Sequence, residues 1–135
     1  MSAASAQDYP TRNVTIVVPY PPGGGTDLFA RAIGQEVSAK LGKPVIVENR
    51  SGASGNIGAE VVVRSPPDGH TLLYTASPIA LSQAVYKKLR FNALRDLTPI
   101  TMAVSIPQVL VVHPALPVKT PKQLVAISKS KPGML

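Results

Sequence analysis

The chain has 135 residues, of which 44% are hydrophobic and 16% charged, so it is long enough for one compact domain and too apolar for a disordered tail. It contains no cysteine, which excludes disulfides and thiolate metal sites, and no apolar run approaches the roughly 18 residues of a membrane span. The net charge is +7, but the basic residues are scattered and only 4% of residues are aromatic, so we expect no nucleic-acid partner. A diffuse positive field of this kind attracts small anions.

Residues 1–8 contain a trace of a leader segment. Ala4, Ser5 and Ala6 have the small-x-small form that signal peptidase recognises, and a typical mature start follows at Gln7. The basic and apolar parts of a signal peptide do not precede them. We therefore expect residues 1–8 to be a residual signal or tag segment and the protein to be exported.

The stretch from Val14 to Leu41 predicts a strand, a turn and a helix. Residues 14–19 are apolar and β-rich, residues 20–25 form a Pro/Gly turn, and Thr26 or Asp27 is predicted to cap the helix. Apolar residues at helical spacing are predicted to face the sheet: Leu28, Phe29, Ala32, Ile33, Val37 and Leu41.

The glycines between this strand and helix leave backbone N–H groups bare, and the helix dipole adds positive charge at the same place. That combination favours an anion such as a carboxylate or phosphate. Glycines serve equally well in an ordinary turn, so this loop alone does not decide between a binding site and a simple connection.

The rest of the chain repeats the alternation of strand and helix. The predicted elements are a strand at 45–48, a helix at 59–64, a strand at 71–75, a helix at 78–88 capped by Ser77, apolar runs at 97–104 and 108–113, and a helix at 120–130. This order predicts an α/β fold, a mostly parallel sheet with helices on both faces. Three strands then end in loops of small polar residues at one edge of the sheet, where ligands of such sheets bind.

Side chains for catalysis are scarce. His70 and His113 are more typical of loop or capping residues than of bases, and the sequence has no G-x-S-x-G elbow and no histidine pair at metal spacing. Asp27 lacks a second carboxylate at a fixed distance. We expect no enzymatic activity, no cofactor and no metal.

A nucleotide- or phosphate-binding α/β domain is the alternative. Gly52, Gly55 and Gly58 follow a strand and open a helix, as the glycines of a phosphate loop do. Their spacing is G-x-x-G-x-x-G rather than G-x-G-x-x-G, and the lysine followed by Ser or Thr of a P-loop is missing.

Four motifs occur in order along the chain: VPYPPGGGTD at 18–27, VENRSGASGNIGAE at 47–60, SPPDGHTLL at 65–73 and VLVVHPALPVKTPKQL at 109–124. Together they resemble the Bug/TctC family, the extracytoplasmic solute receptors of tripartite tricarboxylate transporters. The resemblance implies a single lobe of a type II periplasmic-binding-protein-like fold, located in the periplasm. It also implies a small carboxylate ligand, which is a di- or tricarboxylate, an amino acid or an aromatic acid, and the transporter's membrane components as partners.

The resemblance further implies which residues bind the ligand, on three loops. They are Tyr20, Pro21, Gly23, Gly24, Gly25, Thr26 and Asp27 on the first loop, Ser54, Gly55 and Asn56 on the second, and Thr75, Ala76 and Ser77 on the third.

Members of the family are longer than this chain. We expect residues 9–107 to form an incomplete N-terminal ligand-binding lobe that is truncated before the second lobe. Residues 108–135 would supply a crossover strand, Gln108 to His113, and the first helix toward that lobe. With one lobe we expect weak carboxylate binding, and the exposed lobe face could pair with a second copy as a homodimer.

Overall fold

The structure is a computed structural model that describes residues 9–107 and 109–133. The predicted leader segment and Gln108 lie outside the described residues. Packing divides the chain into two units, Met1–Thr101 and Met102–Leu135, and each is described by itself. The boundary between residues 107 and 108 stays a prediction.

Three parallel strands form the centre of the first unit: β1 (Val14–Val18), β2 (Val45–Asn49) and β3 (Thr71–Leu73). Their order is β2-β1-β3, so β1 is central, with Val14 opposite Val45 and Thr15 opposite Thr71. An almost wholly buried β1 fits its apolar, β-branched sequence, because helices cover both faces of a parallel sheet.

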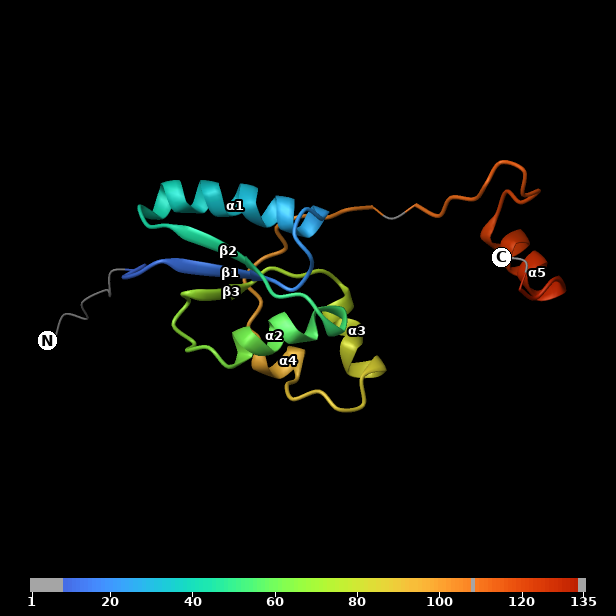
Figure 1. The fold of residues 1–135 in the computed structure, drawn as a ribbon. Coiled ribbons are helices and arrows are strands. Elements are labelled where there is room, and N and C mark those ends of the chain that lie inside the picture. Colours follow the sequence, from blue (N-terminus) through green and yellow to red (C-terminus); the bar gives the residue numbers. More distant parts are fainter. Residues whose placement is uncertain (1–8, 108, 134–135) are drawn as a thin grey trace, which may run out of the picture. The chain divides into compact units, whose positions relative to one another are not determined.

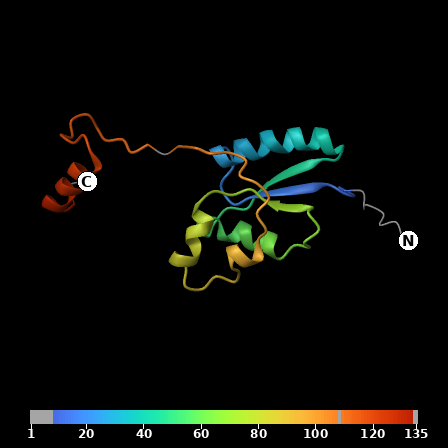
Figure 2. The same cartoon turned by 180° about the vertical axis from the view of Figure 1, so that it is seen from behind.

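The helices confirm the predicted α/β fold. α1 (Gly25–Leu41) covers one face of the sheet and α2 (Asn56–Val63) covers the other (Figures 1 and 2). A short helical turn, η1 (Ala53–Gly55), precedes α2, and α3 (Pro78–Val85) contacts α2, η1 and α4 (Ala93–Asp96).

The predicted sheet-facing stripe of α1 is partly wrong. Ala32 is exposed, and Leu28 and Phe29 are 61% and 40% exposed, whereas the small residues Ala30 and Gly34 are buried. A Cβ on Gly34 would lie 3.4 Å from a methyl group of Val45, so the helix backbone lies directly on the sheet. Small residues therefore mark the packed face here, and two large apolar residues point outward. Ile33, Val37 and Leu41 are half-buried.

Several element ends also differ from the sequence prediction. The N-cap of α1 is Gly24, without a side-chain hydrogen bond, rather than Thr26 or Asp27. α2 begins at Asn56 instead of residue 59, because the left-handed Gly55 ends the preceding turn there. β3 ends at Leu73 and α3 at Val85, and Ser77 makes no capping hydrogen bond through its side chain. The C-cap of α1 is Gly42, which is left-handed and whose N–H donates to the Ser38 carbonyl.

The second unit contains α5 (Pro121–Ser130), whose N-cap Thr120 accepts a hydrogen bond from the N–H of Gln123. The predicted crossover strand does not form in residues 109–113, and residues 97–104 are not a strand either. A strand needs a hydrogen-bonded neighbour, and Val109, Leu110 and Val111 are exposed without one among the described residues. Within the described ranges, no helix is both long and apolar enough to cross a membrane.

Candidate functional site

Three loops lie at the end of the sheet where the parallel strands finish. Loop 1 is residues 19–24 between β1 and α1, loop 2 is residues 50–55 between β2 and α2, and loop 3 is residues 74–77 between β3 and α3. Parallel strands place their carboxyl ends at one edge, so the loops are neighbours although they are far apart in sequence. Every predicted ligand-binding residue lies on one of these loops or on the first turn of α1 or α2.

A buried carboxylate organises loop 1. Asp27 is only 2% exposed, and its Oδ2 accepts from the N–H of Gly23 (2.9 Å) and from Nε of Arg31 (3.1 Å). Its Oδ1 accepts from Nδ2 of Asn49 (2.9 Å), which also donates to the Tyr20 carbonyl (3.1 Å). The carboxylate therefore ties loop 1 to the end of β2, and both of its oxygens are already occupied within the protein.

The same contacts set the charge of Asp27. Its hydrogen bond from Arg31, followed by those from Gly23 and Asn49, lowers the pKa of the carboxyl from 3.8 to about 2, although burial opposes this. Arg31 Nη2 lies 3.0 Å from Oδ1, so the buried negative charge is paired. Asp27 is thus an ionised part of the loop's framework at neutral pH.

Two helix N-termini point into this end of the sheet without side-chain caps. Gly24 caps α1 and Gly55 caps α2, and neither cap makes a side-chain hydrogen bond. The first-turn amides of a helix have no partner inside the helix. The amides of Gly25 and Thr26 in α1 and of Ile57 in α2 are therefore available to an external acceptor, whereas the Asn56 N–H donates to the Ala53 carbonyl. Both helix dipoles favour a negative acceptor.

Loop 2 has an unusual backbone. Ala53 (φ 47°) and Ser54 (φ 55°) are non-glycine residues in the left-handed region, and Gly55 (φ 95°, ψ −5°) continues it before Asn56 turns right-handed. Within this turn the N–H groups of Gly55 and Asn56 donate to the Gly52 and Ala53 carbonyls, and the turn leads directly into the N-terminus of α2. Strained conformations of this kind persist only where the surroundings hold them.

Glycine is required where α2 approaches β1. A Cβ on Gly58 would lie 2.8 Å from Cβ of Pro19 and 2.9 Å from the Arg50 carbonyl oxygen. A Cβ on Gly55 would lie 3.5 Å from the Tyr20 hydroxyl. Loop 2 and the start of α2 therefore pack directly against loop 1, with no room for a side chain at Gly58.

Loop 3 joins the cluster through Tyr20. The Tyr20 hydroxyl lies 3.4 Å from Oγ1 of Thr75, and both residues are half-buried. Ala76 and Ser77 are exposed, as are Pro21 and the three glycines of residues 23–25. The loop cluster thus has a buried framework beneath an exposed surface of backbone and small side chains.

Not all predicted residues face that surface. Asn56 is buried and donates from Nδ2 to the Ala53 carbonyl (2.7 Å), and its Oδ1 has no partner among the described residues. Asp27 is likewise buried. The sequence analysis missed Asn49, Arg31 and Tyr86, whose side chains hold the loops. Arg31 lies four residues after Asp27, a helical ion-pair spacing that could have identified it.

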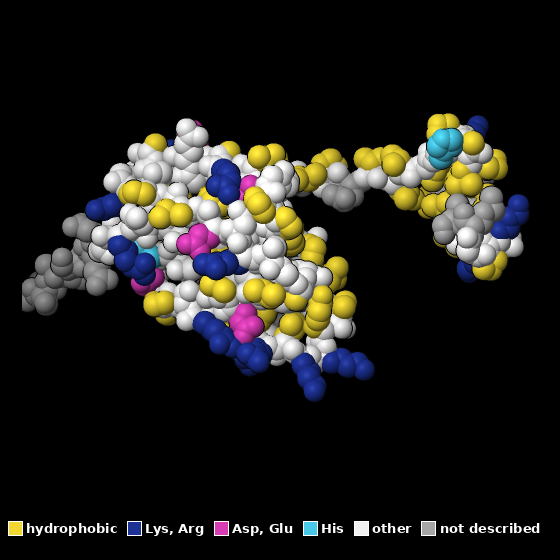
Figure 3. Space-filling view, viewed as in Figure 1, with side chains coloured by type: hydrophobic (Ala, Val, Ile, Leu, Met, Phe, Trp, Pro, Cys, Tyr) yellow, Lys and Arg dark blue, Asp and Glu magenta, His cyan; other side chains and the backbone are white. Residues whose placement is uncertain are grey.

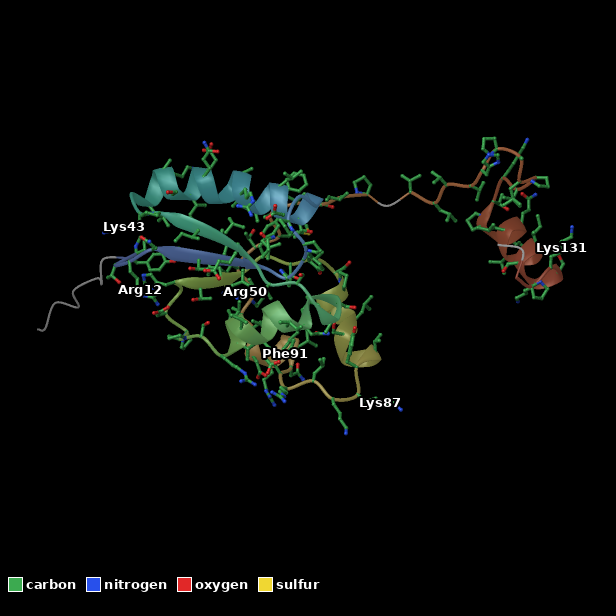
Figure 4. All side chains as sticks on the ribbon, viewed as in Figure 1. Arg12, Lys43, Arg50, Lys87, Phe91 and Lys131 are labelled. Carbon is green, nitrogen blue, oxygen red and sulfur yellow. The ribbon has the colours of Figure 1, made fainter. Side chains whose placement is uncertain are left out.

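Charge outside the loops is dispersed. Lys and Arg side chains of the first unit are spread over its visible face, often beside acidic ones (Figure 3). Arg12 and Lys43 lie at the end of the sheet where β1 and β2 begin, whereas Lys87 follows α3 and extends away from the sheet (Figure 4). Among the described residues, no group of three or more His, Asp or Glu could hold a metal ion.

Comparisons with known proteins agree on one family. The sequence profile of the tripartite tricarboxylate transporter family receptor matches residues 29–135. Protein BugT of Bordetella pertussis is 40% identical over 131 residues, which are 96% of this chain and 40% of BugT. A protein from the tcbD-tcbE intergenic region of Pseudomonas sp. strain P51 is 36% identical over 94% of this chain and 38% of its own length. The chain thus spans about 40% of the length of these relatives.

Two solved structures share the fold. Rpa4515 of R. palustris, determined with adipate, superposes with a TM-score of 0.79 at 36% identity over 95% of this chain and 43% of that protein. MatC from Rhodopseudomonas palustris, determined with bound malate, gives a TM-score of 0.61 at 39% identity over 67% of this chain and 31% of that protein.

Proposed function

The chain belongs to the tripartite tricarboxylate transporter receptor family, and from that membership we propose that its three loops bind a small carboxylate in the periplasm for delivery to the transporter's membrane components. The observation that carries the proposal is the pair of glycine-capped helix N-termini beside the left-handed turn of loop 2. The two helix N-termini present first-turn N–H groups at the same end of one sheet, and the turn of loop 2 sets the start of α2.

The chemistry of the loop surface favours a carboxylate over a cation. Its two acidic oxygens, those of Asp27, are occupied by Gly23, Arg31 and Asn49, so they do not offer a cation a free ligand. An exposed helix N-terminus contributes about 0.3–1 kcal/mol toward binding a negative group. Two such termini can therefore hold a carboxylate without any basic side chain.

The division of roles follows from burial. Asp27 and Asn56 are buried and hold the loops in place. We assign direct or water-mediated contact with the carboxylate to the amides of residues 24–26 and of Ile57, because the N–H groups of Gly55 and Asn56 donate to the Gly52 and Ala53 carbonyls. The exposed or half-buried side chains of Thr75 and Ser77 would meet the rest of the ligand, whereas the Ser54 hydroxyl lies 2.9 Å from that of Tyr86. The relatives determined with adipate and malate support a dicarboxylate as the first ligand to test.

Gly24→Val tests the proposal without straining the fold. Gly24 has an extended conformation (φ −76°, ψ 165°) that valine adopts readily, and a Cβ there would meet only the Pro21 carbonyl, at 3.7 Å. The larger side chain would keep a carboxylate from the neighbouring amides. We expect calorimetry with malate and adipate to show affinity reduced about tenfold or more, which corresponds to ~1.4 kcal/mol.

Ala32→Val is the matched control, because Ala32 is exposed on α1 and lies two turns beyond the loop. It should leave carboxylate affinity unchanged. Equal affinity in a folded Gly24→Val protein would contradict the assignment of loop 1. Heat from ATP, NAD or inorganic phosphate, with none from the dicarboxylates, would favour the phosphate-binding alternative instead.

A further inference from the structure

We propose that Tyr86 is a positioning residue that, from the end of α3, holds loop 2 and with it the N-terminus of α2 in place. The proposal rests on the function proposed above for loop 2. Tyr86 follows α3 directly and is far from loop 2 in sequence, but its hydroxyl lies 2.9 Å from Oγ of Ser54. The bond joins loop 2 to a separate helix.

The conformation of loop 2 needs such support. Ala53 and Ser54 both have a left-handed backbone conformation, which residues with a Cβ rarely adopt in succession. Two hydrogen bonds within residues 52–56 hold the turn. The Gly55 N–H donates to the Gly52 carbonyl (2.9 Å), and Asn56 Nδ2 donates to the Ala53 carbonyl (2.7 Å). The Ser54–Tyr86 bond comes from outside and fixes the side chain of the strained residue itself.

Hydrogen bonds within α3 hold Tyr86 in place. The Tyr86 N–H donates to the Ser82 carbonyl (2.9 Å), and the buried Ser82 hydroxyl donates to the Pro78 carbonyl (3.0 Å). Pro78 comes directly after Ser77 of loop 3. One short helix thus begins at loop 3 and ends against loop 2, so it sets the spacing of two loops in the proposed site.

The consequence is a specific dependence of binding on one hydroxyl group. Without it, the turn would open more often, its Gly55 and Asn56 N–H groups would leave the Gly52 and Ala53 carbonyls, and the Ile57 amide would lose its orientation. The core strands do not contact this bond, so global stability should change little. A binding defect without a matching stability defect distinguishes positioning from a general structural role.

Tyr86→Phe removes the hydroxyl alone, and Tyr9→Phe is the matched control. The Tyr9 hydroxyl donates to the Gly69 carbonyl (2.7 Å) at the opposite end of the sheet. We expect Tyr86→Phe, without ligand, to speed hydrogen exchange of the amides of residues 55–57 about tenfold, and Tyr9→Phe to leave them unchanged. The two variants should melt within a few degrees of each other.

Calorimetry with malate completes the test. Tyr86→Phe and Ser54→Ala should each weaken binding roughly fivefold to tenfold, and the double variant no further, because both remove the same bond. Unchanged exchange of residues 55–57 in Tyr86→Phe would overturn the proposal whether or not malate binds. Faster exchange with undiminished malate affinity would overturn the role in binding. Faster exchange in a protein whose wild type binds no carboxylate would uphold the positioning of loop 2 and refute the proposed function.

Discussion

The two ends of the parallel sheet are built from different kinds of contact. Where the strands begin, side chains satisfy one another: Arg12 pairs with Asp68 (2.9 Å), and the Thr11 N–H donates to Nε2 of His70 (3.2 Å). Where the strands finish, glycines and left-handed residues keep side chains away, and helix amides are left without caps. We call the first the closed end, because its side chains pair with one another. We call the second the open end, because its helix N-termini have no side-chain caps.

The contrast separates the contacts that stabilise the first unit from the N–H groups that we propose to bind a carboxylate. His70 is buried at the closed end, where the ring of Tyr9 packs edge-on against it with the ring centroids 5.0 Å apart. At the open end, the buried carboxylate of Asp27 accepts a hydrogen bond from the half-buried Asn49. Substitutions should therefore separate into those that unfold the lobe and those that affect binding.

Gly58→Ala should have the largest effect, because it inserts a methyl group between α2 and loop 1. The new Cβ would lie 2.8 Å from Pro19 and 2.9 Å from the Arg50 carbonyl, and neither neighbour is a flexible side-chain tip. We expect a loss of roughly 3 kcal/mol in the free energy of unfolding, measured by urea denaturation. Gly25→Ala, where a Cβ meets nothing within 4 Å, is the stability control and should not destabilise. A Gly58→Ala protein as stable as wild type would refute the close packing of loops 1 and 2.

Asp27→Asn should come next and affect both stability and binding. An amide keeps one acceptor oxygen, so its NH₂ group would face the Gly23 N–H or the Asn49 amide, both of which are donors. We expect the melting temperature to fall by roughly 5–10 °C and dicarboxylate affinity to fall with it, because loop 1 loses its anchor. A variant that melts like wild type would show that this carboxylate does not organise the loop.

Acid should weaken the contacts at both ends of the sheet. The pKa of Asp27 is lowered to about 2 by its bonds from Arg31, Gly23 and Asn49, and that of Asp68 to about 2 by bonds from His70 and Arg12. Since each folded pKa lies below the ordinary aspartate pKa of 3.8, these contributions are complete above about pH 4 and are lost as the pH falls toward 2. Urea midpoints measured from pH 7 to pH 2 should show this loss.

Salt separates the two contributions. The Arg12–Asp68 pair is partly exposed, so 0.5 M NaCl should reduce its share of the pH dependence, whereas the buried Asp27 should be affected less. Asp27→Asn should therefore flatten the high-salt profile more than Asp68→Asn does. The reverse ranking would contradict the contrast between the two ends.

Arg12→Ala should have the smallest effect. It removes an exposed ion pair, which contributes about 0.2–1 kcal/mol, at the end of the sheet away from the loops. Stability should fall slightly in urea denaturation, with dicarboxylate affinity unchanged in calorimetry. A clear loss of affinity would mean that the two ends are coupled.

The sequence was sufficient to predict the parallel sheet, the helices α1, α2, α3 and α5 and the three loops, but not the short helix α4. Periodicity and turn residues are local signals, and the run Val14–Val18 with the glycines of residues 23–25 carries them clearly. The packed face of α1 was partly mispredicted because hydrophobicity ranks Leu28 and Phe29 above Ala30 and Gly34. Close approach of two backbones selects small residues, which such a ranking does not detect.

The remaining errors have long-range causes. The Tyr86–Ser54 bond joins residues that are distant in sequence, and no spacing rule connects them. Ala53 and Ser54 are left-handed although neither is a glycine, the residue that usually marks this conformation, so their backbone could not be predicted from the sequence. Val109, Leu110 and Val111 have strand-like sequence, but a strand also requires a neighbour, which the described residues do not provide.

An NMR titration of the ¹⁵N-labelled chain with malate tests the central claim most directly, with the neutral diamide of malate as control. The account predicts that malate, and not the diamide, shifts the amides of residues 24–26 and of Ile57. Amides at the closed end, such as those of Thr11 and His70, should stay in place. Malate-induced shifts confined to the closed end, or equal shifts with the neutral diamide, would contradict carboxylate binding by the loops.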